Sequence, residues 1–179
     1  FHMVAHTPDM FPKTRCSSRE IDNLALFTEK HEGEFMFKEP DELDDRIAYE
    51  EFLGEVKTAC ILSSWTDESS EDEMIETFGV EPGDLYRLIS TAEWLLYSSA
   101  ELAKLLGHKD LLPKIMELHE RVVKGVRQEL LPLTRLEGIG RARARVLYNS
   151  GLRTIEDLHL ASIERLTSLP LIGSSVAKR

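Results

Sequence analysis

Apolar residues recur three and four positions apart in successive segments of this 179-residue chain, and no segment alternates apolar and polar residues as a half-buried strand does. The segment 42–64 keeps the helical spacing from Leu43 and Ile47 onward, which predicts a core helix. Further long helices are expected over 84–106 and over about 110–130. The periodicity therefore predicts an all-α fold built on a helical bundle.

Shorter elements are indicated by capping residues. Ser17 or Ser18 can cap a helix that ends near Gly33, and a serine three residues before a glutamate predicts a capped helix over 71–78. The opening residues 1–5 could form a short terminal strand before a turn.

Charge is distributed unevenly along the chain. Residues 1–84 hold 7 Lys/Arg and 22 Asp/Glu, a net charge of −15, whereas residues 131–179 hold 8 and 4, a net charge of +4. This shift, together with Pro132, predicts a domain boundary near 130 and a small second domain over 131–179. A nucleic-acid contact is expected to use the basic second half despite the total of −10.

Several function classes are excluded. No run of about 18 apolar residues exists, so no membrane span is expected. Cys16 and Cys60 lie far apart, and the six histidines show no metal-ligand spacing, so no metal site is expected. The chain has neither a Gly-x-x-x-x-Gly-Lys-Ser/Thr loop nor an Asp-Glu-x-His box, so we expect no ATP hydrolysis, no catalytic residue and no cofactor in these residues.

The segment 136–152 has the most chemical content. Gly138, Ile139 and Gly140 predict a tight turn whose glycines let the backbone approach a ligand, with Ile139 pointing inward. The unpaired amides of the next helix would bind a phosphate. The segment resembles the helix-hairpin-helix family, which binds the DNA backbone without reading sequence. A poorer copy over 169–178 has Leu171 at the first glycine position, which puts its phosphate binding in doubt.

Three arginines begin the helix after this turn: Arg141, Arg143 and Arg145. Positions two apart lie about 200° apart on a helix, so the first and third share a face. Their guanidinium groups could contact DNA phosphates. The alternative is a solvated helix surface.

Arg87 and Trp94 lie seven residues apart, on one side of the helix 84–106. Both have flat faces on which a nucleobase can stack. From spacing alone the alternative stays open that Trp94 belongs to the core and Arg87 is a surface charge.

Three segments resemble archaeal Hjm-type repair helicases, of the Ski-two-like group in superfamily two. These are 6–10, Lys57-Thr58-Ala59 with Trp65 after it, and the string from Val80 to Leu96. The resemblance covers nearly the whole chain, including the arginine repeat.

The resemblance implies a ratchet domain over 1–130, whose residues 1–10 end a winged-helix region, and a helix-hairpin-helix domain over 131–179, truncated at its C-terminus. It implies that Arg87 and Trp94 stack on the bases of a translocating strand and that the arginine repeat brakes unwinding.

The resemblance also implies properties of the parent enzyme. That enzyme would use ATP and Mg²⁺ to move 3′-to-5′ on single-stranded or forked DNA. Its RecA-like and winged-helix domains would be partners of this chain. The enzyme would be a monomer in the cytoplasm, associated with the nucleoid.

Two other function classes remain. A base-excision glycosylase built on the hairpin would need a catalytic acid, but the nearest acids after Gly140 are Glu156 and Asp157, which look like helix-entry residues. A helical protein-interaction scaffold would instead use the acidic first half to bind a basic partner, without DNA contact.

Overall fold

The computed structural model describes residues 1–178, which form helices and connecting turns without a strand, so the predicted all-α class is confirmed. The α-helices are α1 (His2–His6), α2 (Ser18–Lys30), α3 (Arg46–Thr66), α4 (Glu71–Phe78), α5 (Pro82–Leu105), α6 (Leu112–Lys124), α7 (Leu131–Thr134), α8 (Arg141–Asn149), α9 (Ile155–Leu160), α10 (Ile163–Thr167) and α11 (Ser174–Ala177). Two 3₁₀ turns are η1 (Glu32–Glu34) and η2 (Gln128–Leu130).

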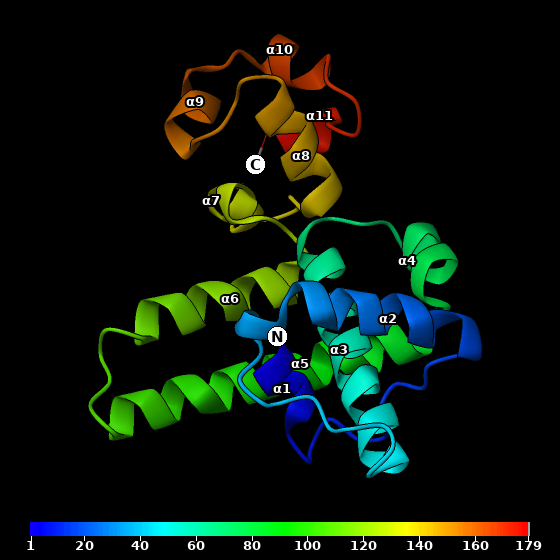
Figure 1. Ribbon diagram of the computed structural model, residues 1–179. Coiled ribbons are helices and arrows are strands. Elements are labelled where there is room, and N and C mark those ends of the chain that lie inside the picture. The colour runs from blue at the N-terminus through cyan, green and yellow to red at the C-terminus, as the bar shows by residue number, and fades with distance from the viewer. Residues whose placement is uncertain (179) are drawn as a thin grey trace.

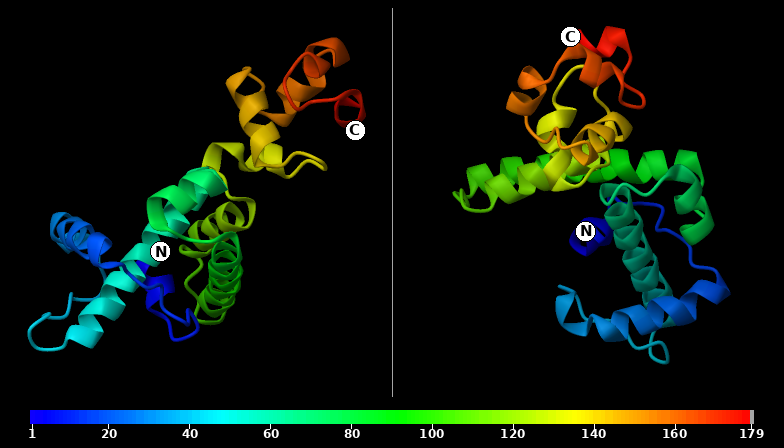
Figure 2. Two further views of the ribbon diagram at one scale, coloured as in Figure 1. Left: turned by 90° about the vertical axis from the view of Figure 1, so that its right-hand side faces the viewer. Right: turned by 90° about the horizontal axis from the view of Figure 1, so that it is seen from above.

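The helices gather into two bodies, which Figures 1 and 2 show from three directions. The first contains α1 to α6, with α5 and α6 running as an antiparallel pair. Its main core is formed by apolar side chains from α3, α5 and α6, among them Ile61, Leu88 and Val122. The second body contains α7 to α11 around a separate core that includes Leu133 and Leu147.

Local capping signals predicted several helix ends correctly. Ser17 and Glu20 form a capping box at the start of α2, and Ser70 forms another at the start of α4. Gly79 closes α4 in the left-handed conformation, and Gly107 adopts the same region after α5.

The possible terminal strand over residues 1–5 was wrong, because the segment is the helix α1. A strand would need a partner strand, and the described residues contain none. The helix satisfies its own backbone instead, since the Ala5 amide donates to the Phe1 carbonyl at 2.9 Å. Val4 and Ala5 are buried in the bundle.

The helix predicted over 42–64 begins later, at Arg46. Asp45 is its N-cap and accepts a hydrogen bond from the Ala48 amide at 3.0 Å. Leu43 and Ile47, predicted as core positions, are 95% and 74% exposed because they lie before and within the first turn, away from the core.

The helix predicted over 110–130 ends at Lys124, because Gly125 adopts a left-handed conformation with φ +60°. This glycine lies directly against the Trp65 ring, where an added Cβ would come within 2.6 Å of the indole. Val126 and Leu130, which follow it, belong to the second core. Gly125 therefore both ends α6 and leaves room for the tryptophan at the junction of the two bodies.

Candidate nucleic-acid interface

Trp94 and Arg87 lie on the side of α5 that faces away from the core. Leu88 and Leu95 are buried in the bundle, whereas the Trp94 indole is 53% exposed. Two helical turns, a rise of about 10 Å, separate the tryptophan from the arginine. The two side chains therefore share an accessible surface, and Trp94 is not a core residue.

The Arg87 guanidinium is loosely held. Its Nη1 lies 3.4 Å from the Phe11 carbonyl oxygen and its Nη2 lies 3.4 Å from that of Pro12. Both distances exceed the usual range for N–H···O bonds, so the contacts are weak. The flat guanidinium can therefore turn toward a ligand at small cost.

The first hairpin turn has the backbone that the glycines predicted. Gly138 is left-handed, with φ +79°, and Gly140 precedes α8 in an extended conformation. The first helical bond runs from the Ala144 amide to the Gly140 carbonyl at 2.9 Å, and no side chain caps the amides before it. These amides at the positive end of α8 can donate to an anion. Ile139 packs against the second core, as expected.

The second hairpin repeats this turn without the first glycine. Leu171 adopts φ +63°, Ile172 is buried, and Gly173 precedes α11 in the extended conformation that Gly140 has before α8. The turn is therefore retained although a leucine occupies a conformation that favours glycine.

Arg143 connects the two hairpin turns. Its Nη1 donates to the Gly138 carbonyl at 2.6 Å, and its Nε donates to the Leu171 carbonyl at 2.9 Å. These carbonyls occupy equivalent positions in the two turns. The Arg143 guanidinium thus links the turns of the two hairpins.

Arg145 and Arg141 share one face of α8, as their spacing predicted, and both contact the bundle from it. Arg145 donates to both carboxylate oxygens of Glu68, at 2.8 and 2.6 Å, and to Glu129 at 2.9 Å. The Arg145 hydrogen bond lowers the pKa of the Glu129 carboxyl below its usual value against the opposing effect of burial. The Arg141 guanidinium stacks over the Trp65 ring at 4.4 Å from its centroid.

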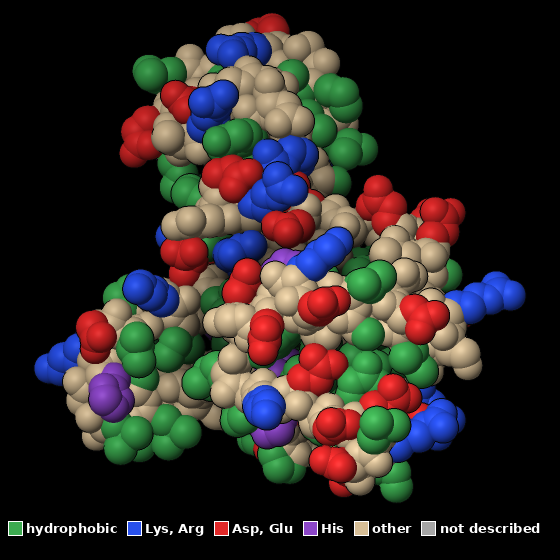
Figure 3. All heavy atoms as spheres, viewed as in Figure 1, with side chains coloured by type: hydrophobic (Ala, Val, Ile, Leu, Met, Phe, Trp, Pro, Cys, Tyr) green, Lys and Arg blue, Asp and Glu red, His purple; other side chains and the backbone are tan. Residues whose placement is uncertain are grey.

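Sequence reasoning missed the protein partners of the three arginines. Trp65 donates from its indole nitrogen to the Val122 carbonyl at 2.8 Å, and Arg141 covers a face of its ring. Glu68 follows the end of α3 with φ +75°. No local pattern marks Glu68, because its contact with Arg145 spans 77 residues of sequence. Figure 3 shows Lys and Arg side chains interleaved with Asp and Glu where the two bodies meet.

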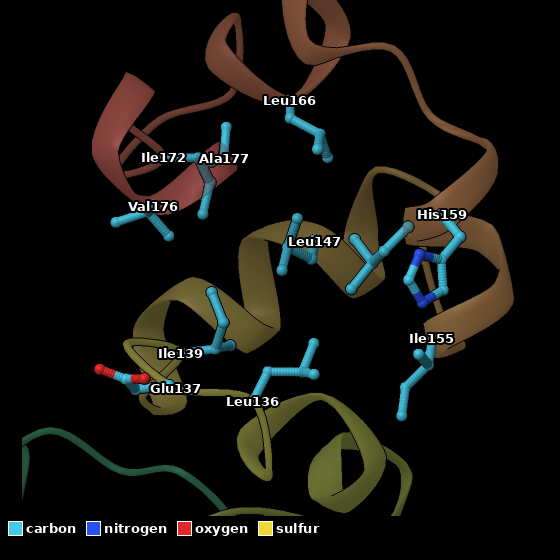
Figure 4. Close-up of a pocket in the computed structure, with 11 residues that line it drawn as sticks. Leu136, Glu137, Ile139, Leu147, Ile155, His159, Leu166, Ile172, Val176 and Ala177 are labelled. Atoms are coloured by element: carbon cyan, nitrogen blue, oxygen red, sulfur yellow. The ribbon is translucent and has the colours of Figure 1, made fainter. Parts of the chain in front are cut away.

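An apolar pocket of about 250 Å³ lies between the two hairpins (Figure 4). The described residues that line it include one acid, Glu137, and one histidine, His159. Asp157, considered for a glycosylase, lies outside this lining and accepts hydrogen bonds from the amides of Arg153 and Thr154, which lower the pKa of its carboxyl. It acts as a helix-entry residue, as its position predicted.

Within residues 1–178, no cluster of three His, Cys, Asp or Glu side chains is arranged to hold a metal ion. None of the described helices is both long enough and apolar enough to cross a membrane.

Comparison with known proteins assigns both bodies to families. Residues 1–125 match a family model described as "Archaeal helicase, domain 4", and residues 130–179 match the "SAM-like Helix-hairpin-helix tandem". The chain is 41% identical over 177 residues to the ATP-dependent DNA helicase Hel308 of Thermococcus kodakarensis. It is 38% identical over 182 aligned positions to the helicase of that name from Pyrococcus abyssi, and 40% identical over 181 to that from Caldivirga maquilingensis. These matches cover 98–99% of the chain but 16–24% of the relatives' lengths.

Proposed function

Because this chain belongs to the archaeal helicase domain 4 family and continues into a helix-hairpin-helix tandem, we propose that it is the single-stranded-DNA-binding, ratcheting and braking part of a helicase. The parent enzyme would be an ATP-dependent 3′-to-5′ DNA helicase that acts in replication-fork repair and recombination. The name that the Hel308 relatives carry, ATP-dependent DNA helicase, supports this class of activity.

One observation carries the proposal. Trp94 presents a half-exposed indole in line with Arg87, on a helix whose opposite side is core. Ser90 and Thr91 lie between them, so the surface that joins the two flat groups has short side chains. A base stacked on each group would gain about 1–3 kcal/mol without regard to sequence, as a translocating enzyme requires.

The hairpin domain would hold the strand beyond this helix. The uncapped amides after Gly138, Ile139 and Gly140 supply phosphate donors that depend on the backbone rather than on a particular base. Arg141, Arg143 and Arg145 would complete the grip when a phosphate competes with the partners that hold them in the DNA-free chain.

ATP and Mg²⁺ would bind other parts of the parent enzyme, since these residues carry no phosphate loop. The proposed partners are single-stranded or forked DNA and the RecA-like and winged-helix domains of the same helicase, which we propose acts as a monomer in the cytoplasm, at the nucleoid.

Tryptophan fluorescence during titration with a thymine oligonucleotide tests the proposal. The chain has two tryptophans, and Trp65 is shielded by Arg141 and Gly125. We expect quenching in the wild-type chain, weakening as salt rises, and its loss in Trp94→Phe with the helical circular-dichroism signal unchanged. A wild-type chain without binding at about 50 mM salt would instead favour the protein-interaction scaffold.

The braking role is tested in the intact helicase. Replacing Arg141, Arg143 and Arg145 with alanine is expected to lower DNA affinity and speed unwinding. Unchanged or slower unwinding would contradict the brake.

A further inference from the structure

We infer that a groove beside Arg87 binds the phosphate backbone of the single strand, with Arg15 as its main contact. The inference rests on the proposed function and extends it to a site outside both the ratchet helix and the hairpins. The groove has a volume of about 330 Å³. Its walls come from the segment 12–15, from α3, from the connection between α4 and α5, and from the first turns of α5.

The lining is basic within the most acidic part of the chain. Four cationic side chains and one acid, Asp84, reach the groove, although residues 1–84 carry a net charge of −15. The cationic residues are Lys13, Arg15, Lys57 and Arg87. Such clustering against the overall composition points to an anionic ligand.

Two of the four cations hold the groove walls in place. Lys13 pairs with Glu55 at 2.9 Å and also donates to the Ala5 carbonyl. Lys57, 6% exposed, pairs with Glu20 at 2.6 Å and donates to the Arg15 carbonyl at 3.1 Å. The last of these bonds anchors the backbone of the residue whose side chain is proposed to bind the ligand.

The other two cations are available to a ligand. Arg15 is exposed and its guanidinium makes no ion pair with any described residue. Arg87 has its two weak carbonyl contacts at 3.4 Å. Guanidinium groups in this state can form paired hydrogen bonds to a phosphate, which bind more strongly than neutral contacts.

The groove continues the stacking surface. A strand that passes over Trp94 and then Arg87 moves toward the N-terminal end of α5, where Arg87 itself lines the groove. A second groove shares Arg15 and Lys57 and extends to Arg19. Arg15 thus lies between two hollows, where a backbone leaving the ratchet helix would pass.

Arg15→Gln in the 179-residue chain, with Lys30→Gln as a charge-matched control, tests the inference. Lys30 ends α2 and does not line either groove. Affinity for a thymine oligonucleotide would be measured at several salt concentrations. Losing one phosphate contact lowers the slope of log K against log salt by about 0.7, which predicts roughly fivefold weaker binding at about 0.1 M salt.

The outcomes separate the groove from the ratchet. A reduced slope in Arg15→Gln alone, with the Trp94 quenching and the thermal midpoint retained, is the expected result. Equal affinities and slopes for Arg15→Gln and Lys30→Gln, with the quenching present, would overturn the groove and leave the proposed function standing. Absence of binding by the wild-type chain would overturn both. Arg15→Glu provides a second test. If Arg15 binds phosphate, reversing its charge must weaken DNA binding more than Arg15→Gln does.

Discussion

Replacing Arg145 with alanine removes three hydrogen bonds at the junction between the hairpin domain and the bundle. Two go to Glu68 in a bidentate arrangement and the third to Glu129. The Arg145 and Glu68 side chains are 29% and 13% exposed. Exposed pairs contribute about 0.2–1 kcal/mol, whereas breaking a buried pair costs about 3–5 kcal/mol. For this intermediate burial we expect a coupling free energy of about 1–2 kcal/mol.

A double-mutant cycle measures this coupling. Arg145→Ala, Glu68→Ala and the double variant would be compared with the wild-type chain by urea unfolding, followed by tryptophan fluorescence, to which Trp65 at the junction contributes. The chain offers a matched control in Arg135 and Glu120, whose bidentate contacts are 2.8 and 2.6 Å but whose side chains are 62% and 26% exposed. We expect a smaller coupling free energy for that more exposed pair. Equal coupling in the two pairs would refute the argument from burial.

The same variants separate docking from direct phosphate binding. If Arg145 mainly positions the hairpin domain, Glu68→Ala should weaken DNA binding as Arg145→Ala does. If Arg145 mainly binds phosphate, Glu68→Ala frees the guanidinium and should strengthen binding. The proposed phosphate contact of Arg145 predicts the second result, and the first result would mean that Arg145, whose Nε and Nη2 are held by Glu68 and Glu129, only positions the hairpin domain.

Three further predictions concern stability. Gly79→Ala and Gly125→Ala each place an alanine at φ +60°, but the added Cβ meets open space at Gly79 and the Trp65 ring at Gly125. Urea unfolding should show that the free energy of unfolding falls by about 1 kcal/mol for the first variant and by about 1–3 kcal/mol more for the second. Equal losses would contradict the contact with Trp65. Leu171→Gly should raise the thermal midpoint by relieving a left-handed leucine, whereas a fall would mean that its side chain contributes more than the strain costs. Burial lowers the pKa of His2 below its usual 6.5, so between the lowered pKa and pH 6.5 the unfolded chain binds more protons than the folded chain. The free energy of unfolding should therefore be fully present above pH 6.5 and fall as the pH drops toward the lowered pKa. His2→Phe should remove this pH dependence in unfolding measured between pH about 5 and 7.

The sequence predicted the helix ends that depend on neighbouring residues. The capping boxes at Ser17 and Ser70 and the stop at Gly79 depend on residues a few positions apart, so they are visible in the sequence. The same holds for the shared faces of Arg87 with Trp94 and of Arg141 with Arg145, since helical geometry alone places each pair.

Tertiary contacts decided the features that the sequence did not predict. α6 ends at Lys124 because Gly125 is left-handed, and the sequence did not predict that the Trp65 ring, 60 positions earlier, fills the space beside this glycine. The exposure of Leu43 and Ile47 follows from where the bundle ends, not from their spacing. Likewise the spacing predicted that Arg145 shares a face with Arg141, but it did not predict the carboxylate partners of Arg145, which are set by how α8 meets the end of α3.

The two proposed DNA-contacting regions are joined through one rigid element. Lys57 of α3 lines the groove beside Arg87, and Trp65, two turns further along the same helix, receives Arg141. A helix rises about 1.5 Å per residue, so α3 separates these points by roughly 12 Å. Because the separation is built into a continuous helix, loosening the contact between α8 and Trp65 should change the path of a strand between the ratchet helix and the hairpins without altering either surface. Variants that loosen the contact between α8 and Trp65 should therefore change the rate of unwinding by the intact helicase, while the quenching of Trp94 by an oligonucleotide stays unchanged.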